Sequence, residues 1–170
     1  MNENQINKLL VQTARGDNDA FAELYEKTKH GVFSFLFSFL QNYEDTEDAM
    51  QTVYLKIKLY IDKYTPDTNG RAWILQIAKN LALNELYARK KTINIDDTDI
   101  EDKSPMSDGI SEIMQKVLDE DERRIVIMHV LWGFKHREIA EMLNCPTGTV
   151  TSKYKRSIAK LKSALKEVEQ

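Results

Sequence analysis

The sequence predicts an all-α protein of two small helical domains joined by an acidic flexible linker. Apolar residues recur at the three- and four-residue spacing of a helix along most of the 170 residues. We find no convincing period-two alternation that would indicate a strand. A segment low in large apolar residues, 92–111, separates the two helical regions and is rich in Asp, Ser, Pro and Gly. We therefore expect domains at 1–91 and 112–170.

Charge is distributed unevenly along the chain, whose net charge is −3. Lys and Arg number 6 against 9 Asp and Glu in 1–60, and 6 against 3 in 61–95. They number 2 against 11 in 96–122, and 10 against 4 in 123–170. Two cationic regions therefore flank a strongly acidic one, which indicates two separate surfaces suited to an anionic partner.

Composition argues against several classes of protein. The single cysteine, Cys145, excludes an internal disulfide, and the three scattered histidines lack the spacing of metal ligands. The most apolar run, 32–40, is too short for a bilayer span, and the first residues lack the order of a secretion signal. No nucleophile with a base and no Gly-rich phosphate loop is present. We expect a cytoplasmic protein that is not an enzyme and has no cofactor or metal.

The first domain is expected to hold helices separated by capping and loop residues. Helices are predicted over about 5–14, from after residue 17 or 18 to 40, from about 44, and over about 71–91. Gly16 ends the first helix, and Asp17 or Asn18 is a suitable N-cap for the second. The run TPDTNG, 65–70, collects the residues that form loops.

Acidic residues open the third predicted helix, at Glu44, Asp45, Glu47 and Asp48. The helix dipole favours acids in a first turn, which is a sufficient structural explanation. An acidic flank followed by an exposed Gln51 and an aromatic residue can equally dock on a basic protein surface. From the residues alone, both interpretations stay open.

The fourth predicted helix is basic and has two unlike faces. One arc is apolar and is expected to be buried: Trp73, Ile74, Ile77, Ala78 and Leu81. The other arc mixes amides, an aromatic ring and bases: Gln76, Lys79, Asn80, Leu83, Tyr87 and Lys90. Such a face suits unstacked bases, which need their edges read and their rings covered. The alternative is an ordinary surface helix with one aromatic residue covering the core.

The second domain is expected to end in a helix-turn-helix. Residues 112–133 supply one or two helices with an apolar stripe through Ile125, Met128 and Leu131. A short amphipathic helix follows at 135–143, then the turn NCPTG, then a long final helix that Thr147 can cap. Gly148 in that turn lets a backbone approach closely.

The final helix has an apolar stripe and a cationic, hydroxyl-bearing face on opposite sides. The stripe holds Val150, Tyr154, Ile158, Leu161 and Leu165. The other face holds Thr149, Ser152, Lys153, Arg156, Lys160 and Ser163. The second helix of a helix-turn-helix enters the major groove, where short polar side chains reach base edges and bases pair with phosphates. Contact with four to six phosphates predicts a slope of log affinity against log salt of about −3.6 to −5.4. A solvated basic face on a surface helix is the plainer alternative.

The order of these segments resembles the extracytoplasmic-function (ECF) class of bacterial RNA polymerase sigma factors, of the sigma-70 family, over nearly the whole chain. EDTEDAMQTVYLK, 44–56, is similar to that family's acidic helix that binds core polymerase. RAWILQIAKNLALNELYARKK, 71–91, is similar to its segment that melts and reads the −10 element. REIAEMLNCPTGTVTSKYKRSIAKLK, 137–162, is similar to its helix-turn-helix for the −35 element. The ordered set is more specific than any one motif.

The resemblance implies a dissociable specificity subunit whose partners are core RNA polymerase and promoter DNA. The implied polymerase-binding residues are Asp45, Glu47, Asp48, Gln51 and Tyr54. The implied −10 residues are Tyr64, Asn69, Arg71, Lys79, Asn80, Asn84, Tyr87, Arg89, Lys90 and Lys91. The implied −35 residues are Arg137, Thr147, Thr149, Thr151, Ser152, Lys153, Lys155, Arg156 and Lys160. Members of this class are often held by an anti-sigma protein, which the resemblance adds as a further partner.

Other functions remain as alternatives at this point. A stand-alone helix-turn-helix regulator, with 1–91 as a dimerisation or effector domain, predicts tight binding to a palindromic operator by the chain alone. A helical adaptor with no nucleic-acid role would leave the basic face unused. The acidic linker is too negative to lie along duplex DNA, so we expect it to thread a basic channel of the polymerase or to shield the cationic faces of the free subunit.

Overall fold

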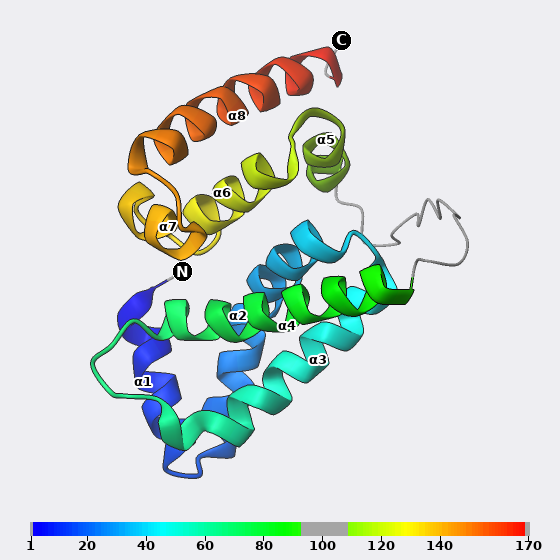
Figure 1. The fold of residues 1–170 in the computed structure, drawn as a ribbon. Coiled ribbons are helices and arrows are strands. Elements are labelled where there is room, and N and C mark those ends of the chain that lie inside the picture. The colour runs from blue at the N-terminus through cyan, green and yellow to red at the C-terminus, as the bar shows by residue number, and fades with distance from the viewer. Residues whose placement is uncertain (1, 93–108, 169–170) are drawn as a thin grey trace. The chain divides into compact units, whose positions relative to one another are not determined.

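The computed structural model describes residues 2–92 and 109–168, and within those ranges all regular structure is helical (Figure 1). The chain divides into two compact units, Met1–Asp102 and Lys103–Gln170. These findings confirm the predicted all-α class. Most of the expected linker, 92–111, lies outside the described residues, and the expectations of threading and shielding fall there as well.

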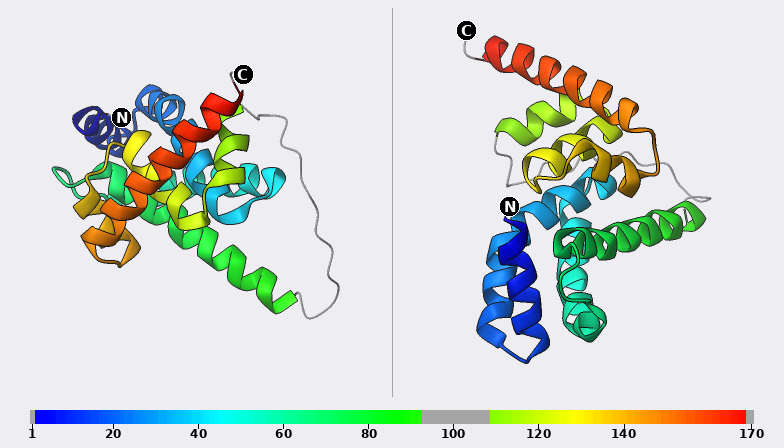
Figure 2. Two further views of the ribbon diagram at one scale, coloured as in Figure 1. Left: turned by 90° about the horizontal axis from the view of Figure 1, so that it is seen from above. Right: turned by 90° about the vertical axis from the view of Figure 1, so that its left-hand side faces the viewer.

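The first unit is built around its second helix. Its elements are α1 (Glu3–Ala14), α2 (Asn18–Leu40), α3 (Tyr43–Tyr60), the 3-10 turn η1 (Ile61–Lys63) and α4 (Gly70–Thr92). α2 contacts α1, α3 and α4, and the right-hand view of Figure 2 shows α1 running beside it. Its C-terminal half is apolar on nearly all sides, which suits a helix with neighbours on several faces. Phe35 and Leu36 there are completely buried.

Side-chain caps explain where α2 and α3 begin. Asp17 precedes α2, and its carboxylate accepts hydrogen bonds from the backbone N–H groups of Asp19 and Ala20, both at 3.0 Å. Asn42 precedes α3, and its side-chain oxygen accepts from the N–H of Asp45 at 2.9 Å. Each cap satisfies donors that lack a partner within the helix and is worth about 1 kcal/mol.

The buried face of α4 differs from the predicted arc. Ile74 and Ala78 are buried as predicted, but Leu75 and Ala82 complete the stripe. The other predicted core residues of α4, Trp73 among them, are only half-buried. α1, α2 and α3 all contact α4, and their combined placement turns the buried stripe toward Leu75. The helical period is therefore right, whereas the direction of the face depends on tertiary contacts that the local pattern does not contain.

The second unit packs three shorter helices against one long helix. It contains α5 (Gly109–Val117), α6 (Glu120–Val130), α7 (His136–Leu143) and α8 (Thr147–Val168). α8 contacts the other three helices, and α6 contacts α7 (Figures 1 and 2). Asp119 separates α5 from α6 because it forms a capping box with Glu122. The sequence predicted one or two helices in 112–133, and the structure has two.

One part of the predicted core of this unit is wrong. Ile125 and Met128 are buried, but Leu131, placed on the same stripe, is 41% exposed. α6 ends at Val130, and Gly133 then takes a left-handed φ of 72°, so the chain turns away before a further helical turn forms. Trp132 and Phe134 fill the core in place of Leu131.

Candidate nucleic-acid interface

The turn between α7 and α8 is fixed by its own backbone. Asn144 ends α7 in the left-handed conformation, with φ 53°, and its N–H bonds to the carbonyls of Ala140 and Glu141. The N–H of Cys145 also donates to Ala140 O, at 3.0 Å. Asparagine tolerates this conformation better than most residues, so the sequence encodes a tight and well-defined turn. α8 starts at Thr147, one residue earlier than a Thr147 cap would place it, a shift within the usual uncertainty of helix ends.

The first turns of α8 present short polar side chains and bases to solvent. The exposed residues of this face are Thr147, Thr149, Ser152, Lys155 and Arg156, and Arg137 of α7 is exposed as well. Thr149, Ser152 and Arg156 are spaced by three and four residues, which puts them on one side of the helix, whereas Thr147 and Lys155 lie outside that stripe. The structure thus places most of the predicted −35 residues on the exposed surface of α7 and the first turns of α8.

Gly148 belongs to this exposed face, and the fold does not require a glycine there. A Cβ built at Gly148 would meet no atom within 4 Å. Beside it lies an open hollow of about 430 Å³ lined by Arg137, Ala140, Glu141, Asn144, Cys145, Pro146 and Thr147. The glycine therefore leaves room for something outside the unit to approach the start of α8.

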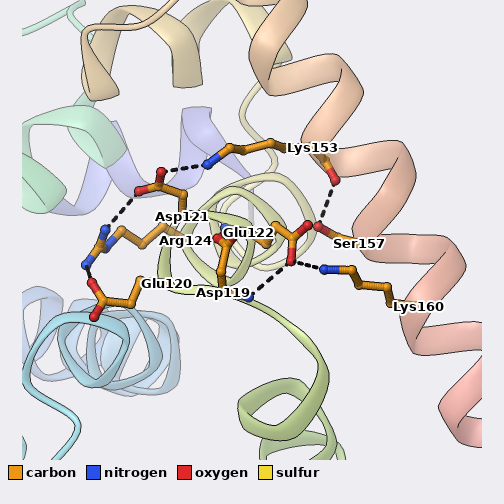
Figure 3. Close-up of polar contacts among 8 residues, drawn as sticks. All are labelled: Asp119, Glu120, Asp121, Glu122, Arg124, Lys153, Ser157 and Lys160. Carbon is orange, nitrogen blue, oxygen red and sulfur yellow. Dashed lines mark hydrogen bonds and ion pairs between the residues drawn. The ribbon is translucent and has the colours of Figure 1, made fainter.

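Two of the predicted DNA-contacting lysines are held by acids of the same unit (Figure 3). Lys153 Nζ lies 2.6 Å from a carboxylate oxygen of Asp121, and Lys160 Nζ lies 2.7 Å from one of Glu122. Both acids are in the first turn of α6. This arrangement corrects the expectation that Lys153 and Lys160 stand free to meet DNA, because each must break an ion pair first.

The two ion pairs differ in burial. Glu122 is 2% exposed and also accepts from the backbone N–H of Asp119, whereas the side chains of Asp121 and Lys153 are 57% and 21% exposed. The hydrogen bond from Lys153 lowers the pKa of Asp121, and the same bond raises the pKa of Lys153. The Glu122 pair therefore fastens α6 to α8, and the Asp121 pair is the more easily opened of the two.

A cluster of three rings joins all three helices of the helix-turn-helix region. His129 of α6, His136 of α7 and Tyr154 of α8 have ring centroids 4.6 to 5.0 Å apart. His136 Nδ1 lies 3.1 Å from the hydroxyl oxygen of Thr151. Burial, followed by the nearby His129 and Lys155, lowers the pKa of His136. Thr151, predicted for −35 reading, is half-buried and bonded to α7 and to its own helix, so it supports α8.

In the first unit, α4 exposes a stripe of amides together with an aromatic ring. Asn80, Asn84 and Tyr87 are all exposed, the last at 68% of its surface. Asn80 accepts a hydrogen bond from Gln76 at 2.8 Å. Lys90 and Lys91 continue this exposed surface toward the end of the helix. A large exposed tyrosine among amides and bases is available for stacking.

Several residues predicted for the −10 element are structural instead. Tyr64 is buried, and its hydroxyl donates to the carbonyl of Thr68 at 3.3 Å. Arg71 is buried and ion-paired with Glu3, so it is not a phosphate ligand of the surface. Asn69, half-buried, accepts from the N–H of Ala72 at 3.1 Å in the first turn of α4, as an N-cap does. Lys79 is half-buried.

The acidic helix α3 is also partly committed within the unit. Asp45 pairs with Arg89 of α4, which also donates to Leu40 O, so these two predicted contact residues bind one another. Tyr54 is 5% exposed, and its hydroxyl lies 2.7 Å from that of Thr28. The expectation that Tyr54 meets a partner is therefore wrong, because its ring belongs to the core.

The remaining surface of α3 is a mixed acidic and apolar stripe. Glu47, Asp48 and Gln51 are exposed, and Leu55 and Leu59 follow at 70% and 68% exposure. The two leucines were missed by the sequence analysis. Their spacing from Gln51, at four and eight residues, places them on the same side of the helix and is the signal that could have found them.

Within residues 2–92 and 109–168, no three His, Cys, Asp or Glu side chains are grouped as metal ligands would be. In the same ranges, none of the helices combines the length and hydropathy needed to cross a bilayer.

Comparisons with known proteins identify both units. Residues 24–92 match the family model described as sigma-70 region 2, and residues 116–161 match the one described as sigma-70, region 4. The chain is 24% identical to the ECF RNA polymerase sigma factor SigW of Bacillus subtilis, covering 98% of this chain and all of that protein. It is 28% identical to the ECF RNA polymerase sigma-E factor of Escherichia coli K12, covering 92% and 93% of the two chains.

Solved structures show the same fold. The sigma factor RpoE of Bartonella quintana, in complex with the anti-sigma factor NepR, matches with a TM-score of 0.67 at 21% identity, over 88% of this chain and 98% of that one. CnrH, in complex with the cytosolic domain of CnrY, matches with a TM-score of 0.64 at 22% identity, over 96% and 98%. The match to sigma-70 region 2 followed by sigma-70 region 4 does not favour the alternative that the chain is a stand-alone helix-turn-helix regulator. The chain belongs to the sigma-70 family, as an ECF-type RNA polymerase sigma factor that directs core polymerase to promoters and initiates transcription.

Proposed function

We propose that this ECF sigma factor has three binding surfaces, for core polymerase, the −10 element and the −35 element, and no catalytic activity of its own. Residues 1–91 bind core polymerase and recognise and melt the −10 element. Residues 92–111 link the domains, and residues 112–170 recognise the −35 element. Since its partner is core RNA polymerase, we also place its action in the cytoplasm.

The polymerase-binding surface is the exposed stripe of α3. An apolar centre beside acidic and amide groups is the composition of a protein docking surface, and Leu55 and Leu59 supply the apolar part. Glu47, Asp48 and Gln51 supply the polar part and favour a cationic partner surface. Leu55→Gln is expected to weaken binding to purified core polymerase about tenfold, as removal of a central apolar contact does. Glu23→Gln on α2 serves as an exposed control.

The −10 surface combines the loop 64–69 with the exposed stripe of α4. Asn80 and Asn84 would read the edges of an extruded base, Tyr87 would stack on its ring, and Lys90 would hold phosphate. Stacking is worth about 1 to 3 kcal/mol per base, which can offset the few kcal/mol needed to unstack it.

The −35 surface is the exposed face at the start of α8. This face is the observation that most strongly supports the proposed function. Thr149 and Ser152 are exposed in its first turns, where a recognition helix meets base edges. Lys155, Arg156 and Arg137 are exposed beside them and would contact phosphates or guanine acceptors.

Run-off transcription with purified core polymerase on a promoter library tests the proposal. The chain is expected to produce start sites that are absent without it. Asn80→Ala and Arg156→Ala should each reduce transcription about fivefold or more, as loss of a specific base contact of about 1 to 3 kcal/mol predicts. Lys166→Ala, exposed at the far end of α8, is the matched control and should leave transcription unchanged. Start sites that do not depend on the added chain would refute the proposal.

We propose in addition that an anti-sigma protein holds this chain. The support is indirect: one similar structure, that of RpoE with a TM-score of 0.67, is described as a complex with an anti-sigma factor. The direct test is to purify the chain from its own cells and to identify the proteins that co-purify with it, both bound to core polymerase and free of it. Recovery of polymerase as the sole partner under all conditions would argue against an anti-sigma protein.

A further inference from the structure

Helix α1 has no part in the surfaces described so far. It precedes residue 24, where the match to sigma-70 region 2 begins. Nevertheless, it contacts both η1 and α4, the two elements that flank the loop 64–69. Helix α1 therefore contacts the elements at both ends of the loop that we propose binds the separated −10 strand.

α1 holds the start of α4 through two polar contacts. The side-chain oxygen of Asn7 accepts a hydrogen bond from the N–H of Gly70 at 2.9 Å. The carboxylate of Glu3, one turn earlier on α1, pairs with the buried Arg71. Gly70 and Arg71 are the first two residues of α4, so one face of α1 binds the N-terminus of α4 where the loop ends.

Side chains of α1 closely approach the backbone at Gly70. A Cβ on Gly70 would lie 2.6 Å from the side-chain oxygen of Asn7 and 2.6 Å from Cδ1 of Leu10. It would also lie 3.3 Å from the hydroxyl of Tyr64. Asn7, Leu10 and Tyr64 therefore surround Gly70, and the loop cannot shift without disturbing α1.

The loop is tied internally as well. The hydroxyl of Thr68 donates to the carbonyl of Thr65 at 2.7 Å, and the buried Tyr64 donates to the carbonyl of Thr68. Asp67, between them, has a left-handed φ of 63°, a conformation that Asp adopts more readily than most non-glycine residues. Residues 65–68 are exposed. The loop thus presents its tip to solvent, and two hydrogen bonds within the loop support its backbone.

We propose that α1 is a positioning element for promoter opening: Asn7, with Glu3 and Leu10, holds residues 64–71 in the conformation that captures the separated −10 strand, although α1 itself does not touch DNA. This inference rests on the proposed −10 role of the loop. A preformed loop does not lose conformational freedom when the strand binds, so affinity for the strand depends on the contacts that preform it.

The test uses holoenzyme assembled from core polymerase and the full chain. Asn7→Ala removes the acceptor of the Gly70 N–H, and we expect affinity for a fluorescent single-stranded −10 oligonucleotide to fall about fivefold, the effect of one hydrogen bond of ordinary strength. Permanganate reactivity of −10 thymines in duplex promoter should fall in parallel. Asn7→Asp keeps an acceptor of the same shape and should restore most of both signals. Lys8→Ala, exposed on the same helix, is the control.

Affinity of the Asn7→Ala chain for core polymerase separates positioning from a general structural role. It should equal that of the parent chain. Parallel loss of core binding and −10 binding would overturn the inference, since the variant would then act through the stability of the whole unit. Unchanged −10 binding would also overturn it. If Asn80→Ala and Tyr87→Ala still weaken −10 binding in that case, the proposed function stands without the inference, and if they do not, both fail.

Discussion

The ion pair between Lys153 and Asp121 predicts a weaker salt dependence of DNA binding than the sequence does. Lys155, Arg156 and Arg137 are the exposed bases near the start of α8, and the ion pair of Arg137 with Glu141 joins side chains that are 83% and 67% exposed, so it competes little with a phosphate. Three phosphate contacts give a slope of log affinity against log salt of about −2.7, compared with about −3.6 for four. Asp121→Asn releases Lys153, so we expect the slope to steepen by about 0.9.

The same substitution should raise affinity at fixed salt. A partly exposed ion pair contributes about 0.2 to 1 kcal/mol. If Lys153 stays paired in the parent complex, its phosphate contact is worth less than this ion pair. Asp121→Asn makes the contact available without breaking a pair, so the gain in affinity is at most about fivefold. The assay is fluorescence anisotropy of the full chain with a labelled −35 duplex, at several salt concentrations.

Glu120→Gln provides a matched control, since Glu120 lies in the same turn of α6 and pairs with Arg124 of its own helix. It removes one negative charge from the same place without releasing a base of α8. The reasoning would be refuted if Asp121→Asn left the slope equal to that of the parent, or if Glu120→Gln steepened it equally. A parent slope of about −3.6 or steeper would show that Lys153 already contacts DNA.

Three further predictions concern stability and its separation from function. Gly148→Ala should stabilise the chain to denaturant by up to about 1 kcal/mol, because alanine is the better helix former, while weakening −35 binding by anisotropy; unchanged binding would contradict the open approach to α8. Burial lowers the pKa of His136 in the folded chain below its ordinary value of 6.5. As the pH falls, the unfolded chain therefore takes up the proton first. The free energy of unfolding is thus expected to keep its full His136 contribution above about pH 7 and to decrease as the pH drops from 6.5 toward the folded pKa. Urea melts across this range should show the fall, and His136→Asn should flatten it. Tyr54→Phe should cost about 1 kcal/mol in thermal melts, because the hydroxyl of Thr28 loses one of its two hydrogen bonds and keeps only the one to the carbonyl of Leu24. It should leave core-polymerase affinity unchanged; loss of that affinity alone would restore Tyr54 as a contact residue.

Local patterns predicted the helices well because their causes are local. The caps Asp17 and Asn42 and the turn at Asn144 act within a few residues of the chain. The helix-turn-helix was therefore readable as a spacing of apolar and polar positions. Which face of α4 would be buried was not readable, since that depends on α1, α2 and α3 together.

Pairing between distant residues limited the prediction of site residues. Lys153 and Asp121 are 32 positions apart, and Arg71 and Glu3 are 68 apart. A charge that is neutralised across such a separation looks like an exposed charge in the sequence. Tyr54 is a different case: it adjoins the buried Val53, three residues before the buried Ile57, so helical periodicity already favoured the core over a contact surface.

The central position of α2 has a consequence for how the protein forms during synthesis. The helices with which α2 has its main contacts, α1, α3 and α4, lie between residues 3 and 92. The N-terminal unit can therefore assemble around α2 once residue 92 has left the ribosome, while the C-terminal unit is still being translated. Since neighbours in sequence supply most of these contacts, we expect this step to be fast compared with elongation.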